Sequence, residues 1–218
     1  MPPRRPIRRV LRAALDARPK RRVRLDNDER RAQLLTLARK AFSDRSYDEV
    51  SIDDLAREAK ISKGLLYHYF PTKRDLYVAG LREIAEELVL TLTSVPRELP
   101  PAERVGRSLD AYLDFVTEHS RAYVSLLRGG IGSDPEVAGV ITGVRKRLAE
   151  SFLDGSPLQP MLAGKPGFET AVRGWLGFVE HASIDWLENA RMPRDQLRDL
   201  LSKVLLAIMG VVAPQLLS

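Results

Sequence analysis

Residues 51–70 have the sequence Ser51-Ile-Asp-Asp-Leu-Ala-Arg-Glu-Ala-Lys-Ile-Ser-Lys-Gly-Leu-Leu-Tyr-His-Tyr-Phe70, which is the most informative segment of the chain. Ser51 and Ser62 each precede a run of apolar residues at helical spacing. Serine is a favoured N-cap residue, because its hydroxyl accepts a hydrogen bond from a free N–H of the first turn. We therefore predict two short helices joined by a tight turn over about residues 51–70. This is the pattern of a helix-turn-helix, and a plain helical hairpin shares it.

The flanking residues extend the helical pattern on both sides. Apolar residues recur at helical spacing over residues 34–42, which predicts a helix before the quoted stretch. Pro71 ends the second short helix, since a proline disfavours α geometry in the residue before it. Thr72 is the N-cap of the next helix. The sequence thus predicts a three-helix unit over residues 26–75, followed by a connecting helix over 76–93.

Helical periodicity continues to the C-terminus, without strand-like alternation. Prolines at 96, 100 and 101 mark a linker, and a segment rich in glycine and proline over 155–167 predicts a second loop. Two last helices are expected at about 168–190 and 194–212. The predicted fold is all-α with about nine helices, in which a larger helical domain over 76–218 follows the N-terminal unit.

The positive charge is concentrated in an N-terminal arm. The chain has 218 residues and a net charge of +6, but residues 1–25 alone hold ten basic side chains and one acidic side chain. Such arms commonly bind phosphate backbones, although a solvated tail without a specific role has the same composition. The predicted backbone contacts of the arm are Arg18, Lys20, Arg21, Arg22 and Arg24.

Several classes of protein are excluded or disfavoured. The chain lacks cysteine, so disulfides, thiol catalysis and cysteine-ligated metals are excluded. Its longest apolar run, residues 204–213, is about half of a membrane span, and residues 1–25 lack the apolar core of a signal peptide. We expect a cytoplasmic protein without a membrane partner. No hydrolase, zinc-protease or nucleotide-binding motif is found, so we expect no enzyme, cofactor or metal site.

The second short helix carries a basic and aromatic surface. Residues 61–74 contain no acidic side chain, while three aromatic residues alternate with Lys63, His68, Lys73 and Arg74. Basic residues interleaved with aromatic residues indicate contact with nucleic acid.

Residues 61–76, Ile61-Ser-Lys-Gly-Leu-Leu-Tyr-His-Tyr-Phe-Pro-Thr-Lys-Arg-Asp-Leu76, closely resemble the signature of the tetracycline-repressor (TetR/AcrR) family of bacterial regulators. The resemblance extends over about residues 28–80. It implies a homodimer whose two recognition helices read a pseudo-palindromic operator in double-stranded DNA, and a C-terminal domain that binds a small-molecule effector. One departure is Lys60, where the family usually has glycine in the turn between the two helices.

The resemblance also implies individual DNA contacts. The matching positions are Ser51, Ser62, Lys63, Gly64, Leu65, Tyr67, His68, Tyr69 and Lys73. The two serines and Lys73 match phosphate contacts, and residues 63–65 match positions that face base edges. The two tyrosines match contacts to the sugar-phosphate backbone, and either can instead be part of the core.

The C-terminal half offers two further sets of candidates. By resemblance, the last two helices form the dimer interface, and their wide apolar surface agrees with this. The interface candidates are Trp175, Phe178, Ala182, Trp186, Leu197, Leu201, Val204, Leu205, Ile208 and Val212. The candidates for an apolar effector pocket are Leu88, Tyr112, Phe115, Val116, His119, Tyr123, Leu127, Phe152 and Trp175.

The sequence therefore predicts a repressor that a small lipophilic ligand releases from its operator. A ligand-responsive activator of the same fold is one alternative. Non-specific binding of nucleic acid through the basic arm is the other.

Overall fold

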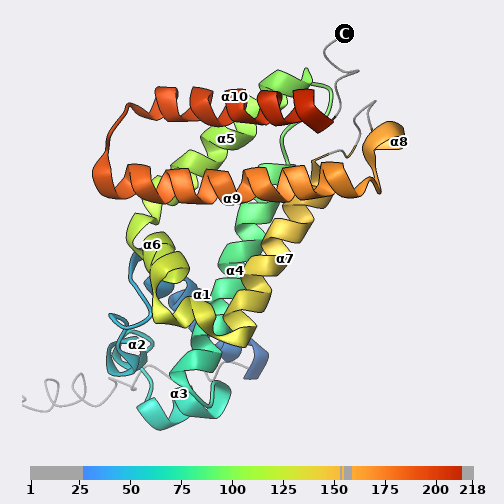
Figure 1. The fold of residues 1–218 in the computed structure, drawn as a ribbon. Helices are drawn as coiled ribbons and strands as arrows, with labels where there is room; N and C mark the ends of the chain where they lie inside the picture. Colours follow the sequence, from blue (N-terminus) through green and yellow to red (C-terminus); the bar gives the residue numbers. More distant parts are fainter. Residues whose placement is uncertain (1–26, 153, 155–158, 213–218) are drawn as a thin grey trace, which may run out of the picture.

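The computed structural model of the chain describes residues 27–152, 154 and 159–212, and this part is all-helical (Figure 1). The elements in chain order are α1 (Asn27–Asp44), α2 (Ile52–Glu58), α3 (Lys63–Tyr69), α4 (Lys73–Thr93), α5 (Pro101–Glu118), α6 (Ser120–Arg128), the 3-10 helix η2 (Gly130–Ser133), α7 (Pro135–Ser151), α8 (Gln159–Leu162), α9 (Pro166–Asn189) and α10 (Arg194–Val212). The all-α prediction, with an N-terminal helix-turn-helix and a larger helical part behind it, is confirmed.

Hydroxyl caps set the starts of α2, α3 and α4. The Ser51 hydroxyl accepts from the N–H of Asp54 at 3.4 Å, and the Ser62 hydroxyl accepts from the N–H of Leu65 at 3.1 Å. Thr72 and Asp75 form a reciprocal capping box. Apolar side chains from all four N-terminal helices then share one buried cluster, so α2 and α3 are held on α1 and the first turns of α4.

Lys60 closes the turn between α2 and α3 in a left-handed conformation, with φ of 56°. Its N–H donates to the carbonyl of Arg57 at 3.1 Å, and the N–H of Ile61 donates to the carbonyl of Ala56 at 3.0 Å. These two bonds form a Schellman motif, whose left-handed position usually holds glycine. A lysine there is strained because its Cβ crowds the backbone.

Lys60→Gly is therefore expected to stabilise the chain. Removing the Cβ relieves about 1–2 kcal/mol of strain, and the greater freedom of glycine in the unfolded chain offsets about 0.5–1 kcal/mol of that gain. The net rise in the free energy of unfolding is expected to be about 0.5–1 kcal/mol, measurable by urea titration. Ala59→Gly is the matched control, because Ala59 has an ordinary right-handed φ of −71° and should be destabilised by glycine.

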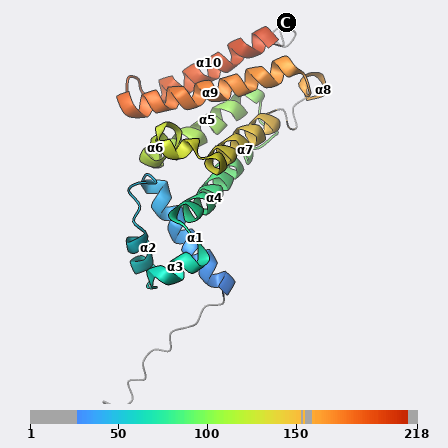
Figure 2. The same cartoon turned by 60° about the horizontal axis from the view of Figure 1, so that its bottom comes forward.

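The C-terminal helices form a layer at the end of the molecule away from α2 and α3 (Figures 1 and 2). There α9 and α10 lie side by side and pack on α5. Helices α4 and α7 run side by side from this layer to the N-terminal unit, and they share one of the most extensive contacts of the fold. None of the described helices is long and apolar enough to cross a membrane.

The segment predicted as a loop over 155–167 is partly helical. Helix α8 lies within it, and α9 begins at Pro166 rather than near residue 168. Proline in the first turn favours a helix start, because its N–H is not needed there and its φ already suits the helix. Leu162 of α8 is 1% exposed and packs with Phe168 and Val172, so burial stabilises a helix that turn-forming residues obscure in the sequence.

Candidate nucleic-acid interface and interior cavity

Helix α3 presents one face to solvent and seats the other in the core. Leu66 is 1% exposed, whereas Leu65 is 39% and Tyr67 is 37% exposed. Lys63, Gly64 and His68 are also exposed. Tyr69 is half-buried against the N-terminal core, with its ring edge-to-face on His68 at a centroid distance of 5.5 Å. Most of the predicted α3 contacts therefore share one accessible surface, and Tyr69 lies at its border.

Two cations beside this surface are held in place. Lys63 Nζ lies 3.1 Å from a carboxylate oxygen of Asp53 on α2, and this hydrogen bond raises the pKa of Lys63. Lys73 Nζ lies 4.4 Å from the centroid of the Tyr47 ring, a cation–π contact. Both ammonium groups lie beside α2 and α3, where positive charge favours contact with nucleic acid.

No contact among the described residues requires a glycine at position 64. A Cβ built there would meet nothing nearer than the Ser62 hydroxyl at 4.0 Å. Glycine in a helix costs about 1 kcal/mol relative to alanine. A bare backbone on an exposed recognition face instead allows another molecule to approach closely. The predicted arm contacts, Arg18, Lys20, Arg21, Arg22 and Arg24, lie outside the described residues.

An ion-pair network ties the N-terminal unit to α7. Arg74, in the first turn of α4, binds both carboxylate oxygens of Asp134 at 2.6 and 2.7 Å, and it also donates to Glu136 at 2.9 Å. Arg82 of α4 donates to the other oxygen of Glu136 at 2.7 Å. Asp134 is also the N-cap of α7, accepting from the N–H of Glu136 at 3.0 Å. Its hydrogen bonds with Arg74 lower the pKa of Asp134 to about 2.

Apolar packing reinforces this link. Val137 of α7 is fully buried within the core cluster of the N-terminal helices. Arg121 of α6 also lies 3.4 Å from Glu49 in the loop before α2. Nothing in the spacing of residues 60 positions apart indicates that Arg74 and Asp134 meet, so this ion pair could not be predicted from the sequence.

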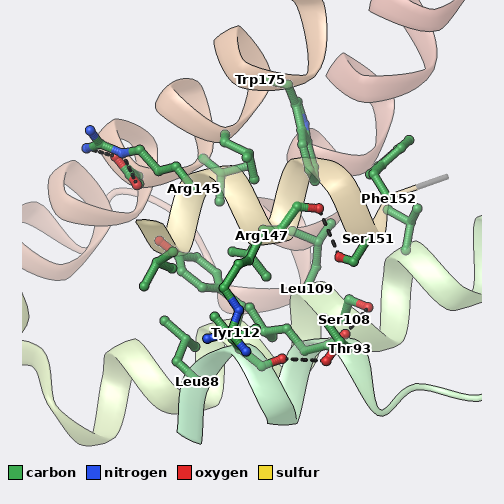
Figure 3. Close-up of a pocket in the computed structure, with 18 of the residues that line it drawn as sticks. Leu88, Thr93, Ser108, Leu109, Tyr112, Arg145, Arg147, Ser151, Phe152 and Trp175 are labelled. Atoms are coloured by element: carbon green, nitrogen blue, oxygen red, sulfur yellow. Dashed lines mark hydrogen bonds and ion pairs between the residues drawn. The ribbon is translucent and has the colours of Figure 1, made fainter. Parts of the chain in front are cut away.

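An interior cavity of about 800 Å³ lies between α4, α5, α6, α7, α9 and α10 (Figure 3). Figure 3 shows Leu109 and Tyr112 of α5, Phe152 at the end of α7 and Trp175 of α9 around this cavity. The predicted pocket residues that line it are Leu88, Tyr112, Phe115, Tyr123, Leu127, Phe152 and Trp175. Val116 is instead fully buried in the core, and His119, at the junction of α5 and α6, is not part of the lining.

The cavity shares part of its wall with the N-terminal core. Leu81 belongs to that core cluster and lines the cavity, and Leu126, Val140 and Ile141 both pack on the cluster and line the cavity. A displacement of these side chains therefore alters both the cavity and the packing of the N-terminal core, because closely packed interiors transmit small displacements.

Most of the residues predicted for a dimer interface are not on the exposed surfaces of α9 and α10. Four of the predicted residues are buried in the chain's own core: Trp175, Leu197, Leu201 and Leu205. Phe178 is 37% exposed, and the other five, Ala182, Trp186, Val204, Ile208 and Val212, are half-buried. The exposed stripes are Gly174, Gly177, Phe178 and His181 on α9, and Leu200, Lys203, Ala207 and Val211 on α10. Periodicity identified the apolar helices but did not separate their two faces.

Comparison with known proteins agrees with this architecture. The family model described as "Bacterial regulatory proteins, tetR family" matches residues 34–80, and the one described as "Tetracyclin repressor-like, C-terminal domain" matches residues 101–208. A tetR-family transcriptional regulator from Streptomyces coelicolor is 34% identical, with a TM-score of 0.78, over 88% of this chain and 85% of that one. The chain belongs to the TetR family. Within this TetR-family chain, α2 and α3 are the helix-turn-helix.

Two curated relatives of this TetR-family chain are named as transcriptional regulators. The HTH-type transcriptional activator FasR of Mycolicibacterium smegmatis is 30% identical over 60% of each chain. The HTH-type transcriptional regulator HbdR of Aromatoleum sp. is 33% identical over 46% of this chain and 44% of its own length. This chain therefore spans about half of the length of the curated relatives that it matches.

Proposed function

We propose that the chain is a homodimeric, sequence-specific DNA-binding repressor that a lipophilic small molecule releases from its operator. The observation that carries the proposal is the wall that the cavity shares with the N-terminal core. Side chains of α4, α6 and α7 line the cavity of about 800 Å³ and also pack in or against the core on which α3 is seated. The exposed residues of α3 supply the reading surface, and two copies would contact two half-sites about one DNA turn apart.

The regulatory step requires a difference in affinity between two states. A ligand shifts an equilibrium only by as much as it binds one state better than the other. A ligand that spreads the cavity would displace Leu126, Val140 and Ile141, which also pack on the N-terminal core. The spacing of the two recognition helices would then change, and by linkage the operator would weaken ligand binding by the same factor.

Selection of bound genomic DNA fragments with the purified full-length chain, at about physiological salt, tests the central claim. One inverted-repeat motif is the expected result. Uniform binding of all fragments would contradict it and favour the basic arm, since phosphate contacts alone carry no sequence information. A chain that lacks residues 1–25 separates the two, because specific reading by α3 should keep its motif without the arm.

Lys63→Ala is expected to lower the affinity of the chain for the selected operator by about tenfold. The ratio of its affinities for the operator and for random DNA should fall as well. A side chain that reads a base edge contributes about 1–3 kcal/mol of discrimination. Fluorescence anisotropy with both DNAs measures this. Lys165→Ala is the matched control, because it removes one exposed lysine just before α9, in the distant layer. An equal loss in both variants would mean that only net charge matters.

Activation is the second candidate, since FasR is named as an activator. In vitro transcription from a promoter that carries the selected motif, with purified RNA polymerase, distinguishes the two directions. Repression predicts fewer transcripts when the chain is added, and activation predicts more.

A further inference from the structure

The cavity wall contains one pair of buried hydroxyls. Tyr112 of α5 and Tyr123 of α6 both line the cavity, and their hydroxyl oxygens lie 2.7 Å apart, close enough for one hydrogen bond. The rings meet edge to face at a centroid distance of 6.3 Å. Burial raises the pKa of Tyr112 to about 12, and it raises that of Tyr123 as well, so both phenols are neutral near pH 7. We call these two residues the tyrosine pair.

The tyrosine pair has hydrogen-bonding capacity left over. Each phenol has one hydrogen to donate and can also accept, so the shared bond uses only one of two hydrogens. The hydroxyl of Ser183 on α9 is fully buried beside the Tyr112 hydroxyl, and a hydrogen bond with it opposes the effect of burial on the pKa of Tyr112. Within the described residues Ser183 has no other hydrogen-bond partner, and with three hydroxyls sharing two such bonds, one hydrogen is still free to donate. An oxygen placed beside the pair would satisfy the donor that the fold leaves open.

The charged side chains of the lining already have partners. Arg145 binds Glu180 through two bonds of 2.9 and 2.6 Å, and Figure 3 shows its guanidinium turned towards that partner. Arg147 likewise binds both oxygens of Glu86, and Arg97 lies 3.6 Å from Asp154. Arg104 donates to two backbone carbonyls at 3.3 and 3.4 Å.

The remaining hydroxyls of the lining are also engaged. Thr93, Ser108, Ser151 and Ser202 each donate to a backbone carbonyl. Within the described lining, the tyrosine pair is therefore where a ligand finds hydroxyls not fully used by the protein. A carboxylate beside the tyrosine pair would find the nearby guanidinium of Arg145 already bound to Glu180, and burying an ion without a partner is costly.

We propose that the ligand of this cavity is an uncharged amphiphile, with an apolar chain or ring system and one carbonyl or hydroxyl oxygen that binds the tyrosine pair. This rests on the proposed function, since it assigns the chemical class of ligand to the same cavity. The apolar part packs against the leucine, valine and aromatic side chains, and the oxygen sets its orientation.

Titration of the purified full-length chain with decanol and with decanoate at pH 7 tests the proposal. Trp175 lines the cavity, so its fluorescence reports occupancy. Decanol is expected to bind more tightly than decanoate. Tyr112→Phe and Tyr123→Phe should each weaken decanol binding by about five- to tenfold, the value of one neutral hydrogen bond, and should leave decanoate binding almost unchanged. Circular dichroism and thermal unfolding verify that both variants fold.

Two variants serve as controls. Thr93→Val removes a lining hydroxyl that already donates to the Val89 carbonyl at 2.8 Å, so it should not change the preference for decanol. Arg104→Gln should not affect decanol either. Tighter binding of decanoate, lost in Arg104→Gln, would overturn the proposal in favour of an anionic ligand. Equal decanol binding by the wild type and both tyrosine variants would overturn the role of the pair.

Absence of binding by either probe would also overturn the assigned ligand class. Operator binding by the same preparation, measured in parallel, shows whether the DNA-binding part of the proposed function stands independently of that failure.

Discussion

Phe178→Glu should leave the chain monomeric and reduce its affinity for a two-half-site operator by roughly a hundredfold or more. The second half-site of a dimer binds at high effective concentration, and losing it typically costs factors of 10²–10⁴. Phe178 is 37% exposed on α9, and its neighbours on the same face, Gly174 and His181, are exposed as well. Light scattering after size exclusion measures the oligomeric state, and anisotropy measures operator binding.

Two glycines support the choice of this face. A Cβ at Gly174 or Gly177 would meet no atom of another described element within 4 Å, although glycine weakens a helix by about 1 kcal/mol relative to alanine. Close approach of a helix from a second copy would explain both residues. Leu90→Glu is the matched control, because Leu90 is a 57% exposed leucine on α4 and not on α9 or α10. A dimer that survives Phe178→Glu would place the interface elsewhere.

Asp134→Asn is expected to lower the melting temperature by several degrees at pH 7, and the difference should shrink in acid. Arg74 lowers the pKa of Asp134 from 3.8 to about 2 in the folded chain. A lowered pKa stabilises the folded state above the unfolded value, and this contribution is lost as the pH falls through the folded value. The gap between wild type and variant should therefore be full above about pH 4 and small near pH 2.

Thermal scans across this pH range measure the gap directly. Asp195→Asn is the control, since Asp195 is an exposed carboxylate in the first turn of α10. A gap for Asp134→Asn that does not change with pH would mean that the carboxylate contributes through its shape and not through its charge.

Local signals in the sequence were enough for the N-terminal unit. Ser51, Ser62 and Thr72 each cap a helix as predicted, because capping depends on residues within one turn. The left-handed turn at Lys60 was also readable from the position where glycine is usual. The exposed face of α3 follows from the same periodicity, once Leu66 is known to be buried.

The cavity and the ion pairs between the N-terminal unit and α7 could be identified only from the structure. Seven of the nine pocket candidates do line the cavity, because apolar residues at helical spacing face the interior whether or not a cavity is present. The Arg145–Glu180 and Arg74–Asp134 pairs could not be predicted from the sequence, because each joins residues that are far apart along the chain. The two faces of α10 were equally hidden, since its apolar surface is wide enough to cover both a core and a partner.

The burial of Val137 has a consequence for engineering. The side chain of Val137 from α7 is part of the hydrophobic core that α1 to α4 form. The N-terminal helix-turn-helix unit therefore cannot be exchanged without part of the C-terminal helices. A chimera joined after α4 would leave a cavity in the core of the N-terminal unit and an exposed Val137 on α7. A functional hybrid with another regulator would therefore need to keep α6, η2 and the first turn of α7 together with α1 to α4.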